Sequence, residues 1–317
     1  MDINSDTYIL TAKKILSLQP WYTSYFTVSV IIPKDNTTIT IPNTNMNAYV
    51  IVWGDTYAKW TYTVDVPEYS HTYEKAGTYR IEIQGATSVG LNAFDGMTNL
   101  GEIDFSYSMV ETIWNGAFSG TNITTITLPT SLRYCGTAVG GIGAFEGCKS
   151  LKEVFIETGT IRIADNAFKD CTSLEYINIP NSVNYIGNNA FAGCASLKDI
   201  VIPDSVVSIG DNAFAGCASL KSIRIGKAVR NMGSGIFDGN IELKTVFMEG
   251  MIPPTIKTQE VETVSEGAST GIPEQTKIMI VYGFGDDYKI HEGWERYASQ
   301  IYSEVLYVND DGDVVQR

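Results

Sequence analysis

The chain has 317 residues, of which 44% are hydrophobic, and it carries a formal charge of −14 at pH 7. This hydrophobic content is sufficient for a sizeable core and excludes global disorder. The acidic balance excludes the clustered Lys and Arg that bind nucleic acid, and it opposes adhesion to anionic lipid. No apolar run reaches the roughly 18 residues of a membrane-spanning helix, so we expect no membrane insertion.

Residues 1–25 are predicted to be a leader ahead of the first domain. The opening stretch, MDINSDTYILTAKKILSLQP, lacks the basic segment, apolar segment and small-residue cleavage site of a signal peptide. Two interpretations stay open. If an export signal has been removed, the protein is extracellular or lies on a cell surface. If the protein is not exported by that route, it is virion-associated or cytoplasmic.

Residues 26–85 are predicted to form a small antiparallel β-sandwich, from the stretches YFTVSVII, TTITIP, AYVIVWG, WTYTVDV and TYRIEI. Two phrases, VIVWGDT (Val50–Thr56) and YSHTYEKAGTYRIEI (Tyr69–Ile83), carry a family resemblance. They resemble the Trp-x-(Phe)-Gly-Asp-Gly and His-Thr-Tyr-x-x-x-Gly-x-Tyr signatures of the polycystic-kidney-disease (PKD) domain, an immunoglobulin-like sandwich. Thr56 stands where that family has Gly, so this turn departs from the family pattern. The resemblance implies a spacer or adhesion module.

The last predicted strand of this domain, Tyr79–Ile83, fits the pattern of the repeats that follow it. Ile81 and Ile83 lie 22 residues before Ile103 and Phe105, which is nearly one repeat step. We therefore expect this strand to pair in parallel with the strand around Ile103, as the first rung of a repeat array. The two parts would then form one stiff body without a hinge.

The phrase NAFAGCASLK occurs at Asn189–Lys198 and again, unchanged, at Asn212–Lys221. Its Ala-Phe pair marks a longer series, whose steps are 24, 27, 23, 23, 23 and 23 residues. The 27-residue step carries four extra residues in YCGTAVGGIGAF (Tyr134–Phe145), which we expect to form a Gly-rich loop on one rim. The marker pairs are Ala93-Phe94, Ala117-Phe118, Ala144-Phe145, Ala167-Phe168, Ala190-Phe191, Ala213-Phe214 and a degenerate Ile236-Phe237.

The fullest copies of the unit read Ile-Gly-x-Asn-Ala-Phe-x-Gly-Cys-x-Ser-Leu-x-x-Ile-x-Ile-Pro-x-Ser-Val. The Leu-x-x-Ile-x-Ile segment alternates apolar and polar residues and predicts a short strand with one buried face. The Ala-Phe-x-Gly-Cys segment predicts one helical turn followed by a Gly-assisted turn. Because one unit cannot bury its apolar side alone, we expect the units to stack into a right-handed solenoid with parallel strands along one face. The predicted strands are Leu100–Phe105, Ile123–Leu128, Leu151–Ile156, Leu174–Ile179, Leu197–Ile202, Leu220–Ile225 and Leu243–Met248.

This unit resembles the leucine-rich repeats of the BspA-like type, found on many bacterial surface proteins, over roughly residues 86–306. We assign residues 86–250 to the solenoid and residues 251–317 to a C-terminal capping unit. The capping unit contains a strand, KIMIVYG, and a predicted helix, DDYKIHEGWERYASQIYSEV. That helix is expected to place Tyr288, Trp294 and Tyr297 over the final layer, because a terminal unit would otherwise expose its apolar layer.

The chain has five cysteines and no Cys-x-x-Cys pair, so we expect no zinc site. The cysteines are Cys135, Cys148, Cys171, Cys194 and Cys217, and the last four recur at the repeat step. They occupy a position that suits a small apolar group. Neighbouring rungs are about 5 Å apart, a spacing that does not forbid disulfides. Parallel side chains and the odd count nevertheless favour a ladder of reduced structural thiols.

Candidate catalytic groups are few. The two histidines, His71 and His291, belong to the PKD-like phrase and to the closing helix, and no Ser-His-Asp arrangement or phosphate-binding Gly-rich loop is present. Glu102 and Asp104 lie two positions apart on one strand, about 6.6 Å between Cα atoms, which is within the range of glycosidase carboxylates. An open face gives a general acid neither enclosure nor a raised pKa, so we expect no enzyme activity, cofactor or metal.

The third and fifth positions of each strand point away from the core, because strand side chains alternate. The third-position column is Arg80, Glu102, Thr125, Glu153, Tyr176, Asp199, Ser222 and Thr245, and the fifth is Glu82, Asp104, Thr127, Phe155, Asn178, Val201, Arg224 and Phe247. Exposed aromatic residues on one face suit sugar rings or a partner's side chains, whereas the alternative is a solvated face with isolated aromatics. The candidate binding residues are Phe155, Tyr176, Val201, Glu102, Asp104 and Phe247.

The sequence therefore predicts a mainly β protein with short helical turns: a PKD-like β-sandwich, a leucine-rich-repeat solenoid and a strand-helix cap. Its predicted function is non-catalytic binding or adhesion of the bacterial-surface type, with the concave face binding a protein or glycan on another cell or particle. The alternative is a structural or host-recognition component of a bacteriophage virion. A secretion signal encoded in frame upstream would favour the first.

Overall fold

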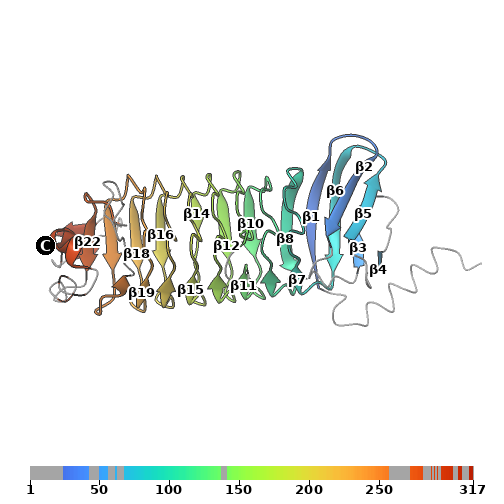
Figure 1. Cartoon of the computed structure of the whole chain (residues 1–317). Helices are drawn as coiled ribbons and strands as arrows, with labels where there is room; N and C mark the ends of the chain where they lie inside the picture. Colours follow the sequence, from blue (N-terminus) through green and yellow to red (C-terminus); the bar gives the residue numbers. More distant parts are fainter. Residues whose placement is uncertain are drawn as a thin grey trace, which may run out of the picture.

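The chain forms one elongated stack in a computed structural model, with an N-terminal β domain at one end and the C-terminal segment at the other (Figure 1). The structure describes residues 24–42, 50–55, 61–62, 68–136, 141–256 and 272–280, and towards the C-terminus residues 287, 289, 291, 294–302, 306–308 and 314–316. Residues 1–23 of the predicted leader, residues 137–140 of the predicted Gly-rich loop, and Tyr288 of the predicted cap lie outside the described residues.

The N-terminal domain is built from antiparallel strands around an aromatic and aliphatic core. One sheet has the order β4-β3-β6-β1-β8, and β2 and β5 form a separate pair. Phe26, Val28 and Trp53 are buried, as the alternating pattern of this segment predicts. The strands are β1 (Tyr25–Ile32), β2 (Thr37–Pro42), β3 (Val50–Val52), β4 (Thr61–Tyr62), β5 (Glu68–Tyr73), β6 (Gly77–Gln84) and β8 (Leu100–Tyr107).

The prediction that Tyr79–Ile83 pairs in parallel with the strand around Ile103 is wrong. Strand β1 lies between β6 and β8 and is antiparallel to both, so that Val28 is in register with Ile81 on one side and with Ile103 on the other. Repeat spacing shows which strands follow one another along the chain. It does not show that an earlier strand, β1, inserts between two of them. Because β1 satisfies the backbone groups along the edge of β8, one sheet runs without interruption from the N-terminal domain into the first repeat.

The repeats place one strand per unit on a common face, as predicted. These strands form two parallel sheets, β10-β12-β14 and β16-β18-β20-β22-β23. Their inward residues lie in register, for example Ile126 with Val154 and Ile223 with Val246. We call their outward surface, continued by β8, the long-strand face. The strands are β10 (Thr125–Leu128), β12 (Glu153–Ile156), β14 (Tyr176–Ile177), β16 (Asp199–Ile202), β18 (Ser222–Ile225), β20 (Thr245–Met248), β22 (Lys277–Ile280) and β23 (Ile301–Tyr302).

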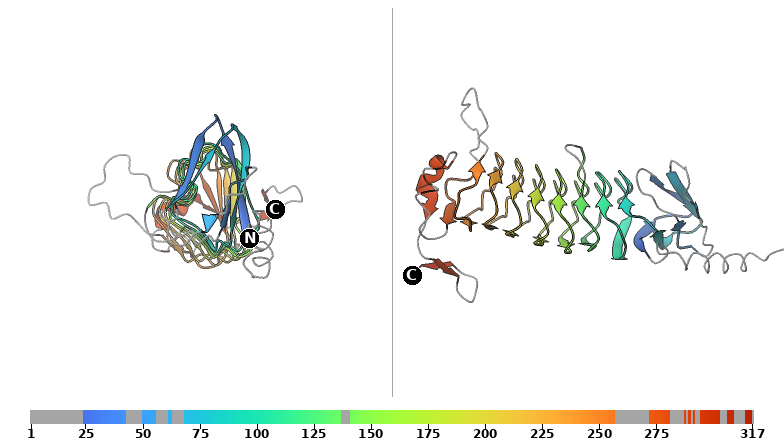
Figure 2. Two further views of the ribbon diagram at one scale, coloured as in Figure 1. Left: turned by 90° about the vertical axis from the view of Figure 1, so that its right-hand side faces the viewer. Right: turned by 90° about the horizontal axis from the view of Figure 1, so that it is seen from below.

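A third parallel sheet, of eight strands, lies along another side of the stack, and the sequence did not predict it. Each of its strands has two residues, which is too short to show an alternating pattern. Figure 2 shows the rungs end-on and from below. We call its outward surface the short-strand face. The strands are β7 (Ser88–Val89), β9 (Thr112–Ile113), β11 (Tyr134–Cys135), β13 (Arg162–Ile163), β15 (Tyr185–Ile186), β17 (Ser208–Ile209), β19 (Asn231–Met232) and β21 (Thr255–Ile256).

The Ala-Phe segments form turns on the third side, where a helical turn had been predicted. The Asn before Ala-Phe has a left-handed backbone in several units, with φ of 58° at Asn166 and 52° at Asn189. Asn tolerates this conformation better than most residues, which explains its place in the pattern. The buried Phe rings stack from rung to rung, with centroids 5.2 Å apart between Phe145 and Phe168.

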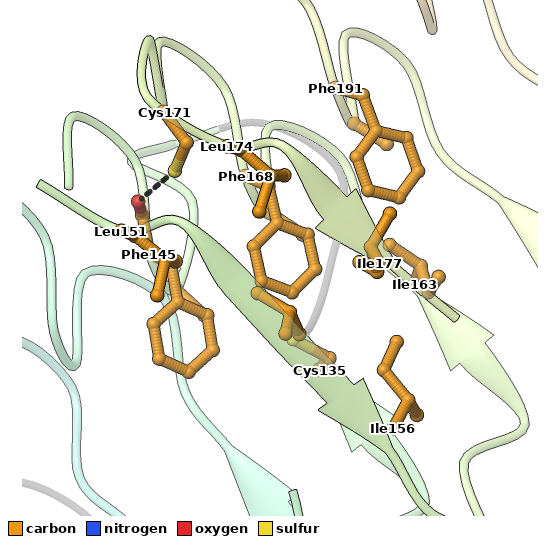
Figure 3. Packing of buried hydrophobic residues seen from close by; sticks show 14 of the residues in the cluster. Cys135, Phe145, Leu151, Ile156, Ile163, Phe168, Cys171, Leu174, Ile177 and Phe191 are labelled. Atoms are coloured by element: carbon orange, nitrogen blue, oxygen red, sulfur yellow. Dashed lines mark hydrogen bonds between the residues drawn. The ribbon is translucent and has the colours of Figure 1, made fainter. Parts of the chain in front are cut away.

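The repeated cysteines are buried beside this Phe column, and each thiol reaches the preceding rung. Cys171 Sγ lies 3.1 Å from the carbonyl oxygen of Phe145 and donates a hydrogen bond to it (Figure 3). The thiols of Cys148, Cys194 and Cys217 bond the matching Phe carbonyls in the same way. All five thiols are free in the structure. Burial raises the pKa of the Cys217 thiol to about 12, so the neutral donor form is favoured.

The C-terminal segment continues the stack through β22, which pairs in parallel with β20. The 3-10 helix η2 (Glu295–Gln300) follows Trp294, which is buried and donates from Nε1 to the carbonyl oxygen of Pro254 at 2.7 Å. Tyr297 is also buried, with its ring 6.1 Å from that of Trp294. A final antiparallel pair, β24 (Leu306–Val308) and β25 (Val314–Gln316), was not predicted. Among the described residues, no helix has the length and apolar character needed to cross a membrane.

Candidate binding face

The long-strand face presents the two outward columns that the sequence predicts. In β12, Val154 and Ile156 are buried while Glu153 and Phe155 are exposed, because successive side chains point to opposite sides of the sheet. Parallel register then aligns the columns between rungs: Glu153 is opposite Tyr176. The predicted outward geometry is confirmed from β8 to β20, but Arg80 and Glu82, predicted to begin the columns, belong to β6, which β1 separates from this face.

Phe155 and Tyr176 lie side by side on this face. Their exposed fractions are 38% and 49%, and their ring centroids are 5.6 Å apart. Val201, two rungs after Phe155 in the same column, is 58% exposed. Single exposed apolar residues are ordinary on a protein surface, so the contact between the two rings is the informative feature. It makes one continuous aromatic surface in water.

A groove of 720 Å³ lies at the N-terminal end of the long-strand face, over β8, β10 and β12. These three strands are neighbours in the stack (Figure 1). Four carboxylates contribute to its lining, and Phe155 forms part of its wall. The groove therefore connects the acidic pair, Glu102 and Asp104, with the aromatic pair at Phe155. The sequence predicted only that the two pairs share a face. Its polar lining includes Glu102, Asp104, Ser106, Thr125, Thr127, Glu153 and Glu157. Glu157 lies beyond the end of β12, outside both columns, and was missed for that reason.

Asp104 is ionised in this groove. Hydrogen bonds from Ser106, through its side chain and its backbone N–H, lower the pKa of the Asp104 carboxyl, and Arg80 lowers it further. The Arg80 guanidinium reaches across β1 to Asp104 at 3.1 Å and also donates from Nε to Thr27 Oγ1 at 2.9 Å. A carboxyl with a lowered pKa holds its proton poorly, so Asp104 is unsuited to act as a general acid.

Asn178 has a structural role on this face that the sequence did not reveal. Its side chain accepts a hydrogen bond from the backbone N–H of Ile156 and donates one to the carbonyl oxygen of the same residue, both at 2.8 Å. A side chain therefore replaces the backbone ladder at the end of β14, and the long sheet is interrupted between β14 and β16. Asn178 also separates Phe155 from Val201 in the fifth column.

The C-terminal part of the long-strand face differs from its N-terminal part. Arg224, in register with Phe247, forms an ion pair with Glu249. Phe247 is half-buried there, two rungs beyond Val201. The structure thus brings Phe155, Tyr176 and the acidic pair together and leaves Phe247 apart from them.

The candidate metal ligands and the two histidines were also located in the described part of the chain. There, no group of three or more His, Cys, Asp and Glu side chains is placed to hold a metal ion. His71 Nε2 lies 2.6 Å from Asp55 Oδ2, and the imidazole stacks on Trp53 with ring centroids 5.1 Å apart. His71 is thus part of the packing of the N-terminal domain. His291 is half-buried in the C-terminal segment.

Stacked parallel strands at a 23-residue step define the chain as a solenoid of the leucine-rich-repeat class. A family model described as "BspA type Leucine rich repeat region" matches it in six copies, over residues 69–139 and 141–258. These segments cover more than half of the chain. The chain belongs to the BspA-type leucine-rich-repeat family.

Solved structures of leucine-rich-repeat proteins are similar to the chain. A protein from Bacteroides ovatus is 24% identical, with 61% of this chain and 57% of that one covered and a TM-score of 0.42. The T. pallidum leucine-rich-repeat protein is 30% identical, with 60% of this chain and 76% of that one covered and a TM-score of 0.42. A leucine-rich cell surface protein from Faecalibacterium prausnitzii is 26% identical, with 52% of each chain covered and a TM-score of 0.33. The chain thus spans a little over half of the Bacteroides protein. No curated protein matches it.

Proposed function

We propose that the chain is a non-catalytic binding protein whose long-strand face contacts a partner protein or glycan. The observation that carries this proposal is the exposed Phe155–Tyr176 pair beside the acidic groove. Membership of a repeat family that builds extended binding surfaces supports it. The lowered pKa of the Asp104 carboxyl argues against its acting as a general acid in the groove.

The chemistry of the face suits recognition. A contiguous aromatic surface gains free energy when a partner covers it, and aromatic residues are enriched among the positions that dominate interface energy. The carboxylates of Glu102 and Glu153 add a polar rim that favours a ligand with hydrogen-bond donors. The Phe155–Tyr176 pair supplies affinity in this proposal, while the groove supplies orientation.

We further propose that residues 26–85 are a PKD-like spacer. The phrases that suggested this family meet in the core: Tyr73 donates from its hydroxyl to the carbonyl oxygen of Trp53 at 2.7 Å, and His71 packs between the two rings. We also propose that residues 251–317 close the stack, a role that the burial of Trp294 and Tyr297 supports. The solenoid between them would occupy residues 86–250.

We place the protein on a bacterial cell surface, in keeping with its family. Protease treatment of intact cells, followed by detection of the chain, tests this location. Protection of the chain in intact cells, with cleavage only after lysis, would contradict it. Recovery of the chain from purified phage particles would support the virion alternative instead.

The binding role is tested with the double variant Phe155→Ala/Tyr176→Ala on a glycan array and in pull-downs. Neither side chain fills the core, so the variant should fold normally. Partners of the wild type should bind it about 2 kcal/mol more weakly, roughly a 30-fold loss, as for a central aromatic hot spot. The matched control is Ile241→Ala, which removes an apolar side chain that is 72% exposed on a turn. Unchanged binding by the double variant would contradict the proposal.

A further inference from the structure

Along the short-strand face each strand contributes one residue on the outer side of the sheet, and three large side chains occupy neighbouring rungs at its centre. The outward residue of β11, Tyr134, is in register with Arg162 of β13, which is in register with Tyr185 of β15. At the other rungs of this sheet the corresponding residue is small or medium and polar (Ser88, Thr112, Ser208, Asn231 and Thr255), and that of the first rung, Ser88, is buried. The Tyr-Arg-Tyr array is therefore a local departure from the repeat pattern.

Arg162 lies flat against one of its neighbours. Its Cζ atom is 4.0 Å from the ring centroid of Tyr185, a cation–π contact that fixes the plane of the guanidinium. Within the part of the chain that the structure describes, the Arg162 side chain has no carboxylate partner, and its Nε is buried without an acceptor. Tyr134, on the other side, is 43% exposed.

The residues next to this array in the sequence carry no negative charge, although the chain as a whole is acidic. The residues that precede the outward position on these three rungs are Arg133, Ile161 and Asn184, none of them acidic. Elsewhere, Arg80 and Arg224 each have a carboxylate partner. On a molecule with a formal charge of −14, an arginine that keeps hydrogen-bond donors without such a partner is a local site of positive potential.

We propose that Tyr134, Arg162 and Tyr185 form a binding site for an Asp or Glu side chain of a partner protein. A planar guanidinium binds a carboxylate through two parallel N–H···O bonds, and a stacked guanidinium loses little freedom when it does so. Tyrosine and arginine are the residues most enriched at the energetic centres of protein interfaces.

A protein carboxylate fits this array better than an acidic sugar does. The guanidinium covers the face of the Tyr185 ring on which a sugar would stack, whereas a carboxylate needs only the outer edge of the guanidinium. The site lies on a different sheet from Phe155 and Tyr176. It therefore gives the chain a second binding surface, whose existence does not depend on a ligand of the long-strand face.

The test measures binding of a fluorescein-labelled hexaglutamate peptide to the full chain by anisotropy at low salt. Arg162→Gln should weaken binding at least about tenfold, because a truncated arginine loses both bonds to the carboxylate. Arg230→Gln is the matched control: it removes the same charge three rungs away, where the side chain donates to the carbonyl oxygens of Lys227 and Val229. This control should change affinity less than about twofold, since only long-range attraction is altered.

A measurement on the wild type avoids any effect of a substitution on folding. The Arg162 Nε–H resonance should shift as hexaglutamate is added, and hexaglutamine should leave it in place. Tyr185→Phe keeps the stack and should bind as the wild type does, whereas Tyr185→Ala should bind more weakly. The proposal is overturned if hexaglutamate does not bind, if Arg162→Gln and Arg230→Gln weaken binding equally, or if oligogalacturonate binds through Arg162 while hexaglutamate does not.

Discussion

The cysteine thiols of the repeats act as hydrogen-bond donors between rungs. Each is buried, and each bonds the carbonyl oxygen of a Phe one rung earlier, at 3.2 Å for Cys194 and Phe168. The ring stack of the Phe column holds that carbonyl in place. A small side chain with one weak donor therefore fits this position, which accounts for its recurrence at 23-residue steps from Cys148 to Cys217.

We expect Cys194→Ala to lower the free energy of unfolding by about 1 kcal/mol more than Cys135→Ala. Both changes remove a buried sulfur, but only the first leaves a carbonyl oxygen, that of Phe168, without its thiol donor. Urea denaturation followed by circular dichroism gives the two midpoints. Equal losses in the two variants would show that the thiol fills space and that its hydrogen bond contributes nothing.

At the scale of single elements, β14 has two residues in ladder geometry, whereas its neighbours β12 and β16 have four each. The Asn178 side chain bridges the gap through its two bonds to Ile156. The strand that carries the Tyr176 ring is thus held in part by the side-chain amide of Asn178, the residue directly after β14.

Asn178→Ala should lower the free energy of unfolding by about 1–3 kcal/mol, since two buried backbone groups lose their partner. Amide hydrogen exchange should then rise at Ile156 and Tyr176. Thr127→Ala, an exposed change in the same column, is the control and should cost about 0.5 kcal/mol or less. If exchange at Ile156 stays as slow as in the wild type, the amide bridge does not stabilise β14.

The long strands were predictable because Leu-x-x-Ile-x-Ile alternates over enough residues to identify its buried side. The outward positions of Phe155 and Tyr176 follow from the same alternation. The short strands were not predictable, since two residues such as Arg162 and Ile163 show no period. The groove was also missed: it needs Glu157 beside Glu102, and those residues are brought together only by the stacking of three rungs.

At the scale of the whole molecule, β1 makes the N-terminal domain and the solenoid share one sheet. Phe26 packs against Phe105 with ring centroids 5.1 Å apart, and both are buried. The two parts are thus joined through a different strand from the one expected, while the predicted absence of a hinge stays a prediction. Sequence could not reveal this, because the partner of β8 lies some 70 residues before it.

A chain limited to residues 86–317 should associate or bind a hydrophobic dye, because it would expose the β8 edge and the side chains of Ile103 and Phe105. Light scattering and dye fluorescence, compared with the full chain, measure this. A monomeric fragment with the stability of the full chain would show that β1 does not protect the first rung.

The unchanged phrase at Asn189–Lys198 and Asn212–Lys221 has a consequence for how this molecule can evolve. If the two coding segments are also alike, unequal recombination between them adds or removes one whole unit. Each unit brings its own Phe ring, thiol donor and strand pair, so the core on either side would remain complete. The distance between the acidic groove and the C-terminal segment would change in steps of about 5 Å. The length of the solenoid can thus change by inheritance in whole repeats, while the two ends of the molecule stay the same.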